Sequence, residues 1–123
     1  MRAFDAVLVD AGGVLVLPDR DAVAAALGSG SWNRAPEVLD RAHYRAVAAV
    51  DDARPDRDGA IIPTYIAAYL QSLEVSADRS DLVDAFAALF DVETPSWNTV
   101  ISESAAALRT IARNYHVVIV SNS

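Results

Sequence analysis

The sequence predicts an α/β fold in which a helical segment interrupts a small parallel sheet. Two apolar runs, residues 6–9 and 117–120, lack polar alternation, which is typical of parallel strands buried on both faces. Between these runs, apolar residues recur at spacings of three and four, which is typical of amphipathic helices. The last of these helices leads into the second run, as in half of a right-handed βαβ unit.

Turn-forming stretches divide the intervening segment into helices that read as a small antiparallel bundle. Residues 28–33 are rich in glycine and serine, and residues 51–59 form a charged, solvated connection. Pro36 suits a first helical position, and Ser80 suits an N-cap. The helices that these signals predict cover residues 21–27, 36–50, 62–73, 80–90 and 100–113.

The polar residues that follow the two strands form the candidate site. Asp10 ends the first run, and Ser121 and Asn122 follow the second. In open α/β sheets, ligands bind beyond the carboxyl ends of the strands, so these side chains are positioned for chemistry. Gly12 and Gly13 lack a Cβ, which lets the backbone approach a phosphate or metal closely. Taken alone, the same stretch also suits a simple turn.

The stretches VLVDAGGVLV and VVIVSNS together resemble the first two motifs of the haloacid dehalogenase-like (HAD) hydrolases. Their spacing is similar to that of the subfamily with a helical cap inserted between the motifs. The resemblance implies a HAD-like Rossmannoid parallel sheet with an inserted α-helical bundle. Residues 1–17 and 95–123 would form part of the α/β core, and residues 18–94 would form the cap.

The resemblance also implies a mechanism. Asp10 would attack phosphorus and form an aspartyl-phosphate, splitting one difficult displacement into two easier steps. A Mg²⁺ ion on the Asp10 carboxylate and the Gly12 carbonyl would neutralise developing charge. Ser121, with main-chain N–H groups near Gly12, Gly13 and Asn122, would donate hydrogen bonds to the phosphoryl oxygens. The expected substrate is a small phosphate ester, such as a phosphorylated metabolite.

Gly12 departs from the family pattern. Most phosphatases of the family carry a second aspartate at this position, which acts as general acid and base. Gly12 can supply a carbonyl oxygen, but it cannot transfer a proton. Dehalogenating members also lack that aspartate, generally have an aromatic residue there and work without a metal. Two alternatives therefore stay open: a 2-haloacid dehalogenase in which Asp10 attacks carbon, and a degenerate or truncated, non-catalytic binding module.

Only two strands are evident, and a two-stranded parallel sheet is not expected to be stable alone. In the family pattern, further strands, a basic residue and acidic residues follow the serine motif, and the ten basic residues here are all arginine. The apparently incomplete core predicts the N-terminal part of a longer enzyme, or a second chain that completes it. Activity is expected of the complete protein, and this form alone can be inactive. The uncovered strands also favour a homo-oligomer.

Composition narrows the expected partners. A formal net charge of -7 disfavours nucleic acid, because affinity for phosphate backbones depends on clustered positive charge. The absence of cysteine excludes disulfides and thiolate metal sites, and it favours a reducing cytoplasm. No run of 18 apolar residues and no signal-peptide pattern occurs, so no membrane partner is expected.

Overall fold

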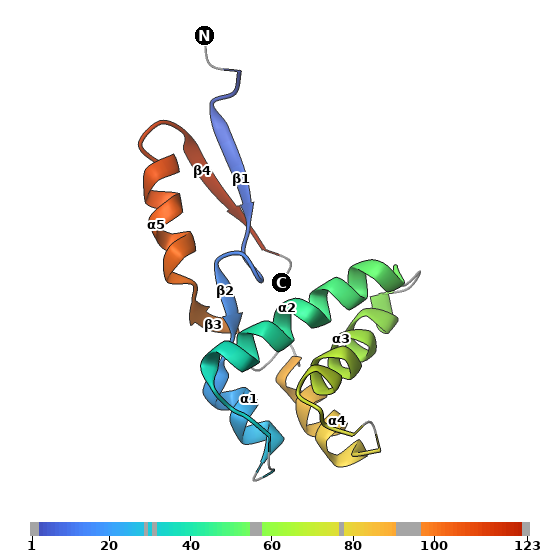
Figure 1. Ribbon diagram of the computed structural model, residues 1–123. Helices are drawn as coiled ribbons and strands as arrows, with labels where there is room; N and C mark the ends of the chain where they lie inside the picture. The colour runs from blue at the N-terminus through green and yellow to red at the C-terminus, as the bar shows by residue number, and fades with distance from the viewer. Residues whose placement is uncertain are drawn as a thin grey trace. The chain divides into compact units, whose positions relative to one another are not determined.

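The computed structural model describes residues 3–28, 30, 32–54, 58–76, 78–90 and 97–121, and it is a mixed α/β structure (Figure 1). Its internal contacts divide the chain into two compact units. Met1–Leu17 and Trp97–Ser123 form the first unit, and Pro18–Ser96 form the second. The boundaries expected from the sequence, after residues 17 and 94, fall close to this division.

A parallel pair of strands forms the sheet of the first unit. β1 (Ala6–Asp10) pairs with β4 (His116–Val120), from Ala6 opposite His116 to Asp10 opposite Val120. Valine and isoleucine dominate these strands, and their branched side chains suit a pleated ladder. The two predicted strands and their parallel direction are therefore confirmed.

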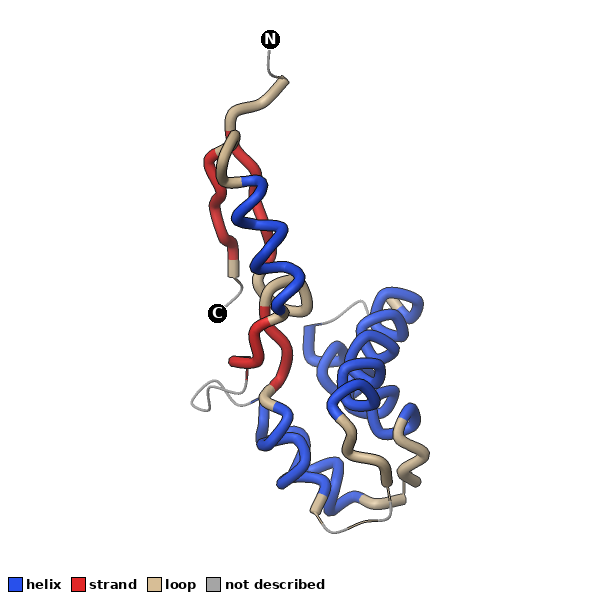
Figure 2. Tube along the Cα trace, turned by 60° about the vertical axis from the view of Figure 1, so that its left-hand side comes forward, coloured by secondary structure: helices blue, strands red, loops and turns tan. Residues whose placement is uncertain are grey.

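The two faces of this sheet differ in exposure. Val7, Val9 and Val117 are half-buried, whereas Leu8 and Val118, which pair with each other, are 71% and 47% exposed. α5 (Ser102–Ile111) lies alongside the strands (Figures 1 and 2). Its half-buried residues form one stripe, as expected for a helix on a sheet: Ser104, Ala105, Leu108 and Ile111. Ile119, which pairs with Val9, is 57% exposed, and no described residue of β1 or β4 is fully buried. The prediction of strands buried on both faces is therefore wrong for the described residues.

A second, short pair of strands follows the loop after β1. β2 (Val16–Pro18) pairs with β3 (Trp97–Val100), and the N–H of Ile101 donates to the carbonyl of Leu15 at 2.9 Å. The sequence predicts a helix over 100–113, but Val100 is extended and the helix begins at Ser102. β3 is rich in aromatic and β-branched residues, which favour extended backbone when a partner strand is present.

Helices make up the second unit: α1 (Arg20–Leu27), α2 (Pro36–Ala53), α3 (Asp58–Ser72) and α4 (Ser80–Ala87), followed by a 3₁₀ turn, Ala88–Phe90. The four predicted helices are present. The connection predicted over 51–59 is shorter, because α2 and α3 extend into it from both sides. No described helix is long and apolar enough to cross a membrane.

The starts of these helices match the capping signals of the sequence only in part. Asp19 caps α1, where its carboxylate accepts the N–H of Asp21 at 2.9 Å and of Ala22 at 3.0 Å. Pro36 occupies the first turn of α2, as predicted. The prediction of Ser80 as N-cap is wrong: Ser80 is already helical, and Arg79 precedes it as the cap residue.

The core of the second unit combines aliphatic side chains with an aromatic cluster. Tyr69 and Phe86 are almost completely buried, with ring centroids 4.7 Å apart. His43 is 1% exposed, and its Nδ1 lies 2.7 Å from the hydroxyl of Tyr65. The other buried residues of this core are Val23, Leu27, Leu39, Ala42, Ala46, Ile66, Leu70, Leu73, Val75 and Leu82.

Helices α1 and α2 are also joined by an ion pair. Arg20 donates to both carboxylate oxygens of Asp40, from Nε at 3.0 Å and from Nη2 at 2.6 Å. This two-pronged geometry is the strongest form of an arginine–carboxylate contact. The guanidinium of Arg20 is therefore engaged within the helical unit.

Candidate active site at the carboxyl end of the parallel strands

Asp10 is the last residue of β1, and Ser121 directly follows β4. Because the strands are parallel and Asp10 pairs with Val120, both polar residues emerge at the same end of the sheet. This end is where ligands bind in open α/β sheets. Both residues are exposed. Asn122, the third polar residue predicted for this site, lies outside the described residues.

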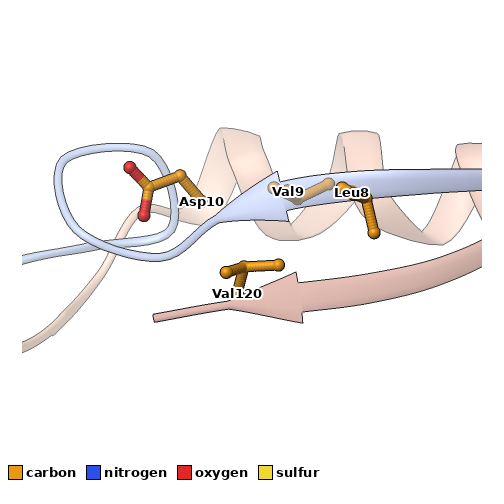
Figure 3. A pocket seen from close by; sticks show the side chains of 4 residues that line it. All are labelled: Leu8, Val9, Asp10 and Val120. Carbon is orange, nitrogen blue, oxygen red and sulfur yellow. The ribbon is translucent and has the colours of Figure 1, made fainter. Parts of the chain in front are cut away.

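The carboxylate of Asp10 is held by its own backbone. The N–H of Ala11 donates to Oδ1 of Asp10 at 2.7 Å and to the carbonyl of Val120 at 3.2 Å. A shared donor of this kind fixes the carboxylate relative to both strands. A pocket of about 330 Å³ adjoins it, lined by Asp10 with three apolar neighbours, Leu8, Val9 and Val120 (Figure 3). Asp10 is therefore the one charged residue among the four that line this pocket.

The loop after Asp10 is a compact hydrogen-bonded turn. The carbonyl of Ala11 accepts the N–H groups of Val14, Leu15 and Val16 at 2.8–3.3 Å. Gly13 has a φ of 72°, a left-handed conformation in which glycine is favoured over other residues. Its N–H donates to the carbonyl of Val16 at 2.8 Å. The predicted phosphate contact of Gly13 would therefore require this N–H to be shared or to change partner.

Gly12 lies in the same loop and faces an aromatic ring. A Cβ at Gly12 would lie 3.7 Å from Cζ3 and 3.9 Å from Cε3 of Trp97, which is ordinary van der Waals contact. Gly12 and Val16 form an isolated β-bridge, whose two hydrogen bonds involve the N–H of Gly13 and the carbonyl of Ala11. The carbonyl of Gly12 takes no part in this bridge. A side chain at position 12 would therefore contact the ring of Trp97.

Two oxygen atoms of this chain are of the type that binds magnesium. The Asp10 carboxylate and the Gly12 carbonyl are hard ligands, and Mg²⁺ in phosphate-transfer sites is typically held by one or two carboxylates, water and substrate phosphate. Among the described residues, no group of three or more histidine, cysteine, aspartate or glutamate side chains is placed to hold a metal. A site here would thus rely on water and substrate for most of its ligands.

The basic side chains described in this unit lie away from Asp10. They are Arg109, Arg113 and His116, and His116 begins β4, opposite the start of β1. Asp10 stands at the other end of the same ladder. Among the described residues of this unit, none of these three basic side chains therefore lies at the end of the sheet where Asp10 is.

In comparisons with known proteins, no protein-family model, no curated protein and no solved structure matches this chain.

Sequence reasoning placed Asp10, Gly12, Gly13 and Ser121 at one end of the sheet, but it missed the contact between Gly12 and Trp97. Trp97 is not among the site residues that the sequence predicts. Only its position in an extended strand beside β2 brings it to the loop after Asp10. A short β-type stretch, WNTV, is the one signal that could have indicated this placement.

Proposed function

We propose that this protein is a HAD-like hydrolase that cleaves a small phosphate ester through an aspartyl-phosphate on Asp10, with Mg²⁺ as cofactor. The observation that carries the proposal is the parallel register of Asp10 opposite Val120, because it brings a nucleophilic carboxylate and the Ser121 hydroxyl to one end of the sheet. The two sequence motifs that resemble the family occupy these strand ends.

In the first step, a carboxylate oxygen of Asp10 forms a bond to phosphorus while the bond from phosphorus to the ester oxygen breaks. The leaving group departs as an alkoxide or phenolate with the electrons of that bond, and it then takes a proton from water. In the second step, water attacks the acyl-phosphate, which returns free Asp10 and inorganic phosphate. The Ser121 hydroxyl donates a hydrogen bond to a phosphoryl oxygen in both steps and stabilises the charge that develops there.

Magnesium, when bound, supplies positive charge that offsets repulsion between the Asp10 carboxylate and the phosphate dianion. In this chain the Asp10 carboxylate and the Gly12 carbonyl would hold it. The bond from the Ala11 N–H to Oδ1 of Asp10 orients the carboxylate, and it leaves Oδ2 outside that contact. One oxygen is thereby positioned by the backbone, which favours a defined attack geometry.

The test is turnover of a generic aryl phosphate with Mg²⁺ and with excess chelator, by the wild type and by Asp10→Asn. We expect magnesium-dependent hydrolysis that falls at least about a thousandfold in Asp10→Asn. Asp5→Asn is the matched control, because Asp5 is an exposed aspartate just before the opposite end of β1. Equal turnover by wild type and Asp10→Asn would refute the proposal.

The apolar lining beside Asp10 favours a second candidate function, displacement of halide from a 2-haloacid. Leu8, Val9 and Val120 would accommodate a short carbon chain, and Asp10 would attack carbon to form an ester. This reaction would proceed equally well with chelator present. Halide release without added metal, combined with no phosphate release, would favour it over the phosphatase.

A further inference from the structure

We propose that Trp97 is a substrate-binding residue that selects phosphate esters with an aromatic leaving group and no second anionic group. This inference rests on the proposed phosphatase function and names the class of its substrate. Three independent features support it: the position of Trp97, the absence of a proton donor at Gly12, and the charge around Asp10.

The indole of Trp97 lies beside Gly12, in the loop that follows the candidate nucleophile. Its six-membered ring is within van der Waals distance of a Cβ at Gly12, and Gly12 follows Asp10 by two residues. Consecutive Cα atoms are about 3.8 Å apart, so the Cα of Gly12 is at most about 7.6 Å from that of Asp10. Trp97 is also 38% exposed, so part of its ring is accessible to a ligand. An aromatic group bonded directly to a phosphate on Asp10 would meet this ring by extending past Gly12.

The chemistry of the first step favours the same substrates. Gly12 has no side chain, so position 12 cannot protonate the departing oxygen. A leaving group must then depart as an anion. Phenols ionise with a pKa of about 10, whereas simple alcohols, like water, are far weaker acids. Aryl esters are therefore the substrates that need a general acid least.

Charge argues against substrates that carry several anionic groups. The chain has a net charge of -7, and the arginines described in the first unit, Arg109 and Arg113, are in and after the last turn of α5. Beside Asp10 the pocket walls are Leu8, Val9 and Val120. A second phosphate or a carboxylate on the substrate would lack a cation in this pocket, whereas an uncharged aromatic group needs none.

The test compares two phosphate monoesters whose leaving groups have similar acidity, phenyl phosphate and a fluorinated alkyl phosphate. Because the two leaving groups have similar acidity, a difference between the esters reports recognition by Trp97 and not the ease with which the leaving group departs. We expect Trp97→Ala to raise KM for phenyl phosphate by roughly threefold to tenfold, with little change for the alkyl ester. Trp97→Phe keeps an aromatic face and should stay within about twofold of the wild type for both esters.

Val100→Ala is the matched control, because Val100 is in the same strand, is 65% exposed and points to the opposite face from Trp97. It should change neither KM. An equal loss on both esters in Trp97→Ala, with Trp97→Phe equally impaired, would overturn the proposal, since Trp97 would then only support the loop.

A binding measurement keeps this inference distinct from the proposed function. The chain has two tryptophans, so Trp32→Phe leaves Trp97 as the one fluorescent indole. Phenylphosphonate, which has no ester bond to cleave, should quench this fluorescence in a saturable way, and methylphosphonate should not. Quenching without any catalysis would sustain the aromatic site and refute the phosphatase. Catalysis on Asp10 without selective quenching would refute the role of Trp97 alone.

Discussion

Nδ1 of His43 lies 2.7 Å from the phenolic oxygen of Tyr65, and both residues are buried where α2 and α3 pack together. The rings are also in contact edge to face, with centroids 5.7 Å apart. Burial lowers the pKa of His43 to about 4, and the nearby Asp40 carboxylate opposes that shift only in part. The imidazole is therefore neutral at pH 7, and its hydrogen bond with Tyr65 lies inside a largely apolar core.

Tyr65→Phe should destabilise the helical unit more than Tyr69→Phe does. Without the Tyr65 hydroxyl, Nδ1 of His43 loses this buried partner, at a cost of about 1–3 kcal/mol. The hydroxyl of Tyr69 donates to the main-chain carbonyl of Leu39 at 3.1 Å, a carbonyl within α2, so its loss should cost about 1 kcal/mol or less. Urea denaturation followed by circular dichroism measures both. The reverse order would show that the pair with His43 contributes little.

Acid should weaken the fold through His43. In the unfolded chain histidine binds a proton with a pKa near 6.5, whereas in the folded chain the pKa of His43 is about 4. Between these values the unfolded state binds more protons, so the free energy of unfolding decreases as the pH falls from 6.5 to 4. The stabilising contribution is complete above pH 6.5, and the total loss at pH 4 is roughly 3 kcal/mol.

Denaturation curves between pH 7 and pH 4 measure this effect against two variants. His43→Gln should flatten the pH dependence, because glutamine stays neutral throughout. His116→Gln is the control: His116 is the other histidine of the chain, is exposed, and should leave the slope unchanged. Equal slopes in wild type and His43→Gln would show that carboxylates alone cause the loss of stability in acid.

Gly12→Asp should restore a proton donor beside the nucleophile. A Cβ at this position meets Trp97 at an ordinary contact distance, so the side chain can be accommodated with small adjustment of the ring. We expect turnover of alkyl phosphates to rise by roughly tenfold to a hundredfold, with a smaller gain for aryl phosphates. Gly12→Asn has the same size and no transferable acidic proton, and it should give no gain. Equal rates in both variants would place the proton transfer elsewhere.

The elements that follow from local pattern were predictable from the sequence. The unbroken apolar runs of β1 and β4, the stripe of α3 and Pro36 at the start of α2 each carry a strong local signal. β2 and β3 were missed because each is three or four residues long and depends on a partner far along the chain. Short strands of this kind are stabilised by pairing rather than by propensity.

In the candidate site, too, features that depend on local sequence were predictable, and features that depend on contacts far along the chain were not. Asp10 and Ser121 follow strands that sequence pattern identifies, so their shared end of the sheet was predictable. The contact between Gly12 and Trp97, and the bond of the Gly13 N–H to Val16, depend on the path of the loop and of β3. In the core, the spacing of His43 from Leu39 and Ala46 indicates a buried face, but its pairing with Tyr65 depends on how α2 and α3 pack together.

The most direct test of the account is covalent labelling of the nucleophile. The wild type is mixed with phenyl phosphate and Mg²⁺, quenched in acid within one turnover, reduced with borohydride and mapped by peptide mass spectrometry. Reduction converts an aspartyl-phosphate to homoserine, so the account predicts homoserine at position 10, dependent on Mg²⁺ and on substrate. Phosphate release that persists in Asp10→Asn, with no modification at position 10 in the wild type, would contradict it.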